Sequence, residues 1–89
     1  MSRTRVLNNE EQKYLRQANN EIYSNLIKAL ELLEESRSLL KHLDFHTLEQ
    51  FAIDDRISRG VVGVKMAMIR SEEFAEEIES GKVTTEGFY

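Results

Sequence analysis

The stretch that decides the fold is residues 15–43, LRQANNEIYSNLIKALELLEESRSLLKHL. It contains neither glycine nor proline, the two residues that disfavour a helix interior most strongly. At about 100° per residue, one series of side chains falls close to a single line along a helix. The series is Leu15, Ala18, Ile22, Leu26, Ala29, Leu33, Ser36 and Leu40. This spacing predicts a helix that buries one face along its whole length.

The predicted helix extends over residues 9–43. Asn8 or Asn9 is a suitable N-cap, and Glu10 and Glu11 follow where carboxylates interact favourably with the helix dipole. At a rise of about 1.5 Å per residue, this helix is roughly 50 Å long.

The apolar stripe is wider than one partner helix can cover. Leu32 and Leu39 extend it on one side, and Ile27 and Leu30 extend it on the other. Asn25 is the one amide on the line itself, so it needs a hydrogen-bond partner if it is buried. We therefore expect this helix to contact more than one neighbour.

A second helix is predicted over residues 47–80. Thr47 and Gln50 fit a capping box at its start, and Gly81 follows where a helix is expected to stop. Apolar residues again recur at helical spacing: Ile53, Ile57, Val61, Val64, Met68, Ala75 and Ile78. Gly60 and Gly63 weaken this helix, because glycine costs about 1 kcal/mol in a helix interior. A kink or a break at these glycines is the alternative.

These patterns predict an all-α fold, an antiparallel hairpin of two long helices. Residues 1–89 form a single small domain, and segments 1–8 and 82–89 are expected to fray. The second helix carries a further apolar set away from its main stripe: Leu48, Phe51, Val62, Met66 and Ile69. Because an isolated hairpin leaves this set exposed, we expect a homo-oligomeric helical bundle. A dimer is favoured over a higher ring, and a three-helix monomer folded back at Gly60 or Gly63 is the alternative.

Composition excludes several classes of protein. The chain has no cysteine, so it forms neither a disulfide framework nor a thiolate metal site. It has no apolar run near the roughly 20 residues of a membrane span, and no signal peptide is predicted. A net charge of −4 argues against general nucleic-acid binding. A cytoplasmic location suits such a chain.

A cluster of arginines on one side of the second helix is the candidate ligand site. Arg56, Arg59 and Arg70 lie on that side with Gly63, which leaves a low spot between the side chains. A guanidinium is a planar fork of donors that suits phosphate or carboxylate. The alternative is a solvated face whose arginines pair with acids such as Asp55, Glu73 and Glu77.

No set of residues points to catalysis or to a cofactor. His42, Asp44 and His46 lie near the turn, but two imidazoles and one carboxylate around a turn do not predict a metal site. The C-terminal Phe88 and Tyr89 are candidate interface anchors, since aromatic residues often dominate small interfaces.

The sequence therefore favours a non-enzymatic, oligomeric helical binding protein. Its size and acidity suit a small regulator or inhibitor that occupies a protein partner, of the kind that phages and mobile elements encode. One alternative is a protein that binds or sequesters a small anion or a cyclic nucleotide through the arginine face at a subunit interface. A second alternative is a structural assembly protein.

Overall fold

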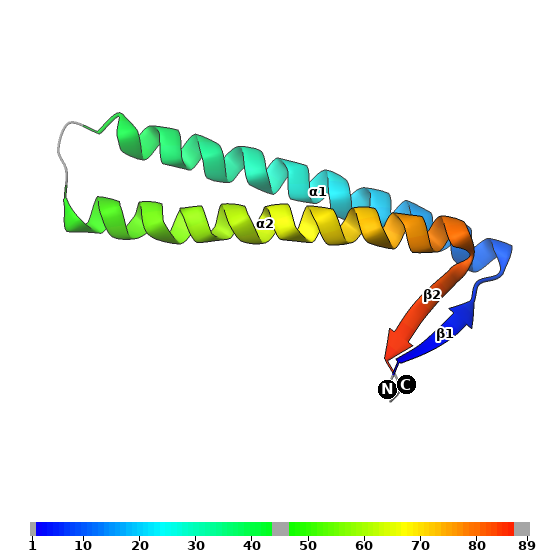
Figure 1. The fold of residues 1–89 in the computed structure, drawn as a ribbon. Helices are drawn as coiled ribbons and strands as arrows, with labels where there is room; N and C mark the ends of the chain where they lie inside the picture. Colours follow the sequence, from blue (N-terminus) through cyan, green and yellow to red (C-terminus); the bar gives the residue numbers. More distant parts are fainter. Residues whose placement is uncertain (1, 44–46, 87–89) are drawn as a thin grey trace.

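The computed structural model of the chain describes residues 2–43 and 47–86. The elements follow in the order β1 (Ser2–Val6), α1 (Asn9–Lys41), α2 (Leu48–Ser80) and β2 (Lys82–Glu86). The two helices run antiparallel, side by side, and the two strands project from the end opposite the turn (Figure 1). The molecule measures 57 × 26 × 16 Å. The helical hairpin is confirmed, and a small sheet is added to it.

The predicted caps form at the start of both helices. The Asn8 side chain accepts a hydrogen bond from the backbone N–H of Glu11 at 2.8 Å, and the Thr47 hydroxyl accepts one from Gln50 at 3.1 Å. In both cases the third helical residue bonds back to the cap, which completes a capping box. Helix α2 continues without interruption through Gly60. The alternative of a break at Gly60 or Gly63 is therefore wrong.

The seam of α1 is rotated from the predicted line. The side chains nearest α2 follow a heptad pattern: Asn19, Tyr23, Leu26, Leu30, Leu33, Arg37 and Leu40. Of the predicted line, Leu26, Leu33 and Leu40 lie at the seam, but Ile22 is 50% exposed and Ser36 is exposed. The predicted line lies between two neighbouring stripes of α1. Helix α2 covers the seam stripe and leaves the stripe with Ile22 and Ser36 exposed.

The seam of α2 matches the predicted stripe from Ile57 to Ile78. Its buried apolar members include Val61 and Ile78, the latter with no exposed surface. The expectation for Ile53 is wrong, because this side chain is 47% exposed. Asp54 takes the inward position instead, where its Oδ1 lies 3.1 Å from Nε of Arg37. The ion pair joins the two helices near the turn.

A buried polar pair fixes the register of the hairpin. The Asn19 side chain is 5% exposed and donates from Nδ2 to the Ser71 carbonyl at 3.0 Å. The Ser71 hydroxyl in turn donates to Oδ1 of Asn19 at 2.7 Å. Asn25, the amide singled out from the sequence, is exposed. Because both groups are buried and satisfied only at this alignment, a shifted register would leave them unpaired.

Replacing one member of this pair should be costly and replacing both should not. Asn19→Leu leaves the Ser71 hydroxyl buried without its acceptor, so we expect a loss of about 1–3 kcal/mol of stability. The double variant Asn19→Leu with Ser71→Ala should recover most of that loss, because no polar group is then stranded. Urea unfolding followed by circular dichroism measures both. Additive losses in the double variant would contradict a coupled pair.

Residues 2–6 and 82–86, within the segments expected to fray, instead pair with each other as two strands. Strands β1 and β2 form an antiparallel ladder in which Arg3 faces Thr85 and Arg5 faces Val83. Val83 is buried, and Gly81 links α2 to β2 in the left-handed conformation, with a φ of 80°. Such a φ favours glycine, since other residues pay a steric penalty there. Phe88 and Tyr89 lie outside the described residues.

Candidate interaction surfaces

The hairpin is a single layer of two helices, so it covers little of its own surface. Its shortest dimension is 16 Å, and its radius of gyration is 18.3 Å, against about 12 Å for a compact domain of this length. The exposed area is 7178 Å², about 1,800 Å² more than a compact monomer of this mass exposes. Both faces of the layer therefore remain open to solvent or to partners.

One face of the hairpin is crossed by polar contacts between the helices, and we call it the polar-bridged face. Nε of Arg16 lies 2.6 Å from Oε1 of Glu79, and the Tyr23 hydroxyl donates to Glu72 at 3.0 Å. The hydrogen bond from Arg16 lowers the pKa of Glu79, while the bond to Glu72 raises the pKa of Tyr23. Because the pKa of Glu79 is depressed, the contribution of this pair is lost as the pH falls through the acid range.

The opposite face, which we call the small-residue face, has a different character. Helical spacing places one set of residues on this side of the seam: Ile22, Ala29 and Ser36 on α1, and Ile53, Gly60 and Ala67 on α2. A Cβ at Gly60 would lie 3.7 Å from Cδ1 of Leu33, which is ordinary contact. The polar contacts given above for the described residues lie in the seam or on the polar-bridged face. The small-residue face thus carries small and apolar side chains next to the seam.

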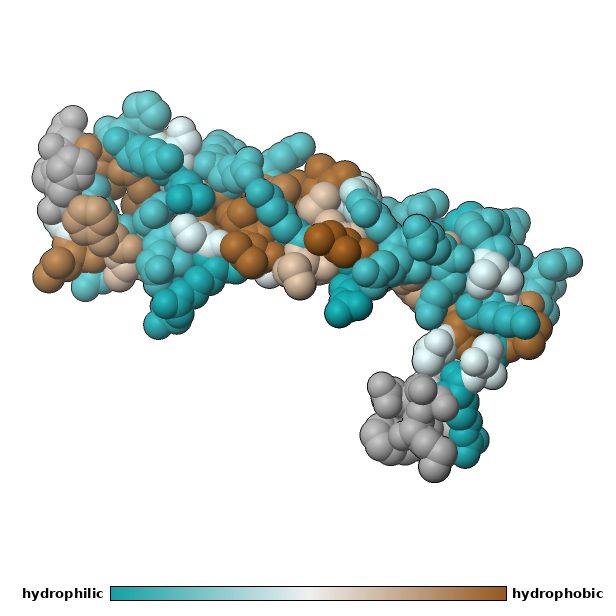
Figure 2. Space-filling model, viewed as in Figure 1, coloured by the Kyte–Doolittle hydropathy of each residue, from teal (hydrophilic) through white to brown (hydrophobic). Residues whose placement is uncertain are grey.

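The apolar set predicted on α2 lies outside the seam, and we call it the outer stripe. Its members are exposed: Leu48 by 86%, Phe51 by 63%, Val62 by 60%, Met66 by 54% and Ile69 by 49%. Figure 2 shows brown surface at the turn end of the hairpin and again along its middle. The outer stripe thus has two exposed apolar parts, Leu48 and Phe51 near the turn and Val62, Met66 and Ile69 along the middle of α2, and the ion pair of Asp55 with Arg59 lies between them. Its role as an interface stays a prediction.

The predicted arginine cluster does not converge within one chain. Arg59 lies 3.2 Å from Asp55 and Arg70 lies 3.0 Å from Glu73, which are pairs of the solvated-face alternative. On a continuous helix, Arg70 lies about 16 Å farther along the axis than Arg59. No atom lies within 4 Å of a Cβ built on Gly63, so the space between the arginines is open. Arg56 is exposed as well.

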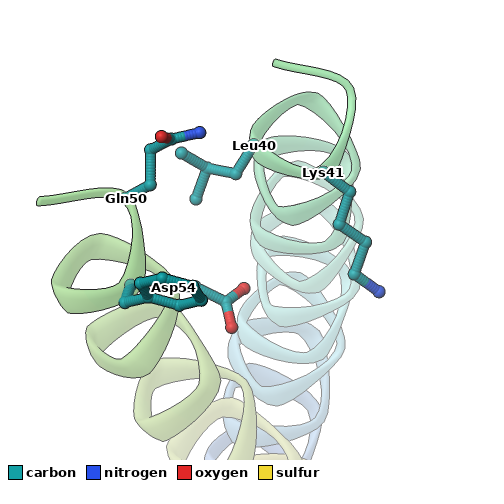
Figure 3. Close-up of a pocket in the computed structure, with 5 residues that line it drawn as sticks. Leu40, Lys41, Gln50 and Asp54 are labelled. Atoms are coloured by element: carbon teal, nitrogen blue, oxygen red, sulfur yellow. The ribbon is translucent and has the colours of Figure 1, made fainter. Parts of the chain in front are cut away.

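Two hollows lie at the ends of the hairpin. Near the turn, a cavity of about 290 Å³ is lined by Leu40, Lys41, Gln50, Phe51 and Asp54. Figure 3 shows Leu40 pointing toward Gln50 on the other helix, while Lys41 extends away. At the other end, an apolar groove of about 420 Å³ separates the strands from the helices, with Tyr14, Phe74 and Val83 in its lining. Neither hollow gathers a set of convergent polar groups.

The described residues contain no group of three or more metal-ligating side chains. The ring of His42 makes a 2.7 Å hydrogen bond to the carbonyl of Ser38. Asp44 and His46, the other members of the sequence cluster, lie outside the described residues.

The chain matches no family model, no curated protein and no solved structure. In the described part of the chain, neither helix is both long enough and apolar enough to cross a membrane.

The two buried polar residues that sequence reasoning missed had a detectable signal. Asn19 lies seven residues before Leu26, and Ser71 lies seven residues after Val64. Extending the heptad of each helix by one repeat places both side chains in the seam. The apolar pattern does not predict these two positions, because both side chains are polar.

Charges on the seam and on the outer stripe should have opposite consequences. Val61 is 7% exposed, so Val61→Asp buries a carboxylate without a partner and should unfold the hairpin. Met66→Asp on the outer stripe should retain most of the helix content, because the side chain stays in water. Far-ultraviolet circular dichroism at several temperatures measures the helix content of both variants. Equal loss of helix in both variants would mean that the outer stripe is buried.

Proposed function

We propose that this chain is a non-enzymatic, oligomeric helical binding protein that acts as a small regulator or inhibitor by occupying a protein partner. The observation that supports this most is the outer stripe of α2, where large apolar side chains are between 49% and 86% exposed. Clusters of large exposed apolar side chains generally mark an interaction site. The opposite side of α2 is already used by the seam with α1.

The chemistry of the outer stripe suits a helical or grooved protein surface. Its apolar residues recur at helical spacing, which is how an amphipathic helix presents anchors to a groove. Lys65 flanks Val62, and Asp55 lies on the same line of the helix between Leu48 and Val62, so charged groups of both signs adjoin the apolar residues. Met66 adds a side chain that adapts its shape to a partner. A partner of this kind would bury the stripe and leave the rim in water.

The test is capture of a partner by the intact chain and by matched variants. A true partner should be retained by the wild type and lost from Val62→Asp and Ile69→Asp, which place charge in the apolar stripe. Glu31→Lys serves as the control, because it changes charge at an exposed position on α1, away from the outer stripe of α2. Calorimetric titration of the purified partner should then show at least a tenfold loss of affinity for Val62→Asp. Equal binding by all variants would contradict this function.

A second candidate is binding of a small anion or nucleotide at a subunit interface. It is favoured by Arg56 and Gly63, which leave an open space beside an exposed guanidinium. Because Arg70 is too distant in the same chain, a second subunit would have to supply it. An arginine fork then binds phosphate in a bidentate manner that lysine does not reproduce.

Thermal unfolding tests this second candidate. A panel of phosphate, mononucleotides and cyclic nucleotides should raise the melting temperature by an amount that grows with ligand concentration. Arg59→Ala should abolish that shift, and Arg59→Lys should restore only part of it. If the melting temperature does not move with any of these compounds, the arginine face is a solvated surface.

A third candidate is a structural assembly protein. The small-residue face and the outer stripe lie on different sides of the hairpin, so contacts through both would extend an assembly beyond two subunits. Native mass spectrometry of the purified chain separates a closed dimer or ring from an open series of species.

A further inference from the structure

We propose that a second copy of this chain packs on the small-residue face, with α1 lying antiparallel to the partner's α1 in a two-fold four-helix bundle. The inference rests on the oligomeric part of the proposed function and names the surface that forms the contact. It leaves the outer stripe of α2 free for a different protein.

The first support is a second heptad stripe on α1 that α2 does not cover. Its members recur at alternating steps of three and four residues: Ile22, Asn25, Ala29, Leu32, Ser36, Leu39 and Leu43. Leu32 and Leu39 are 63% and 64% exposed. A heptad stripe of this length is the pattern by which one helix packs against another. The seam with α2 uses the neighbouring stripe, so α1 has room for a second helix.

The second support is that the stripe is complementary to itself in one antiparallel register. With the two-fold axis level with the midpoint of residues 30 and 31, Ala29 faces the partner's Leu32. Ile22 likewise faces the partner's Leu39. The small Ala29 then meets a large side chain, as an interdigitated core requires, and Ile22 with Leu39 forms an apolar pair farther from the axis.

The polar residues of the stripe select that register over its neighbours. In it, Asn25 faces the partner's Ser36, and the amide can donate to the serine oxygen. The Ser36 hydroxyl already donates to the carbonyl of Leu32 at 2.9 Å, and its oxygen keeps the capacity to accept. A slip of one heptad in either direction would set Asn25 against the partner's Ala29 or the partner's Leu43. The amide would then be buried without a partner, which disfavours both slipped registers.

The charges beside the stripe agree with the same register. Lys28 and Glu35 border its outer edge, at the positions that meet across an antiparallel pair. The two-fold axis places Lys28 near the partner's Glu35, and Glu35 near the partner's Lys28. Unlike charges therefore meet at both symmetry-related sites.

The glycines of α2 provide the third, independent support. The contacts of Asn19 with Ser71 and of Arg37 with Asp54 set residues 30 and 31 of α1 level with residue 60 of α2. The same two-fold axis then passes close to Gly60 and Gly63. The two α2 helices would cross where neither carries a side chain, which allows close approach. This gives the helical glycines a packing role that the single chain lacks, because the space at Gly63 is open.

The available area is sufficient for such a dimer. The chain exposes about 1,800 Å² more than a compact monomer of its mass, and a stable interface needs roughly 800 Å² from each partner. The bundle also supplies the second layer that a helical domain needs to enclose a core.

The dimer also brings arginines of the two chains closer together. The axial separation between Arg56 and Arg70 is about 21 Å within one chain, and it is less than about 10 Å between Arg56 and the partner's Arg70.

Disulfide trapping tests the register directly, because the chain has no native cysteine. Asn25→Cys mixed with Ser36→Cys should give a cross-linked heterodimer under mild oxidation. Neither variant alone should cross-link, because each cysteine lies about 16 Å along the axis from its own symmetry mate, while a disulfide needs Cα atoms within about 7 Å. Self-linking of one variant at the same rate, or no linking in the mixture, would overturn the proposed register.

Light scattering combined with size exclusion tests the surface. The wild type should be a dimer, while Leu32→Asp and Gly63→Leu should shift it to monomer by at least tenfold in dissociation constant. The matched control, Val62→Asp, should remain a dimer, since Val62 lies on the outer stripe. A monomeric wild type, or dissociation by Val62→Asp and not by Leu32→Asp, would overturn the proposal. Retention of the partner protein by Val62→Asp, with the dimer intact, would instead contradict only the proposed function.

Discussion

Two antiparallel helices form one layer, and one layer has a single internal seam. In this chain the seam buries few side chains completely, among them Val61 and Ile78. A helical domain normally gains its core from a second layer. The single seam therefore explains the elongated shape, the large exposed area and the apolar stripes on the outside. Every surface considered for function follows from this limit.

Polar groups specify how the layer is aligned. An apolar heptad seam tolerates a slip by one repeat, since similar side chains then meet again. The Asn19–Ser71 pair and the Arg37–Asp54 pair lie near opposite ends of the hairpin and fit only one alignment. The ladder between β1 and β2 adds a third constraint, because its register joins the two ends of the chain. The hairpin is thus held in register at both ends and the outer stripes are set in fixed positions.

The two sides of the layer suit different partners. The polar-bridged face carries the Arg16–Glu79 ion pair and the Tyr23–Glu72 hydrogen bond between the helices, which keep it compatible with water. The small-residue face carries alanine, serine and glycine at its centre, which suits close packing of another helix. The outer stripe of α2 carries longer side chains with a charged rim, which suits a separate protein surface. The proposed self-association and the proposed partner binding can therefore occur together.

The sequence by itself determined the two helices, both capping boxes, the seam of α2 from Ile57 to Ile78 and the exposure of the outer stripe. These are local properties, fixed by helical periodicity and by side chains near each end. Only the tertiary structure decided which half of the wide α1 stripe is covered, because that depends on how α2 rotates against it. It also decided that Asn19 and not Asn25 is the buried amide. The strands could not be predicted from either end, because each becomes a strand only when the hairpin brings it to the other.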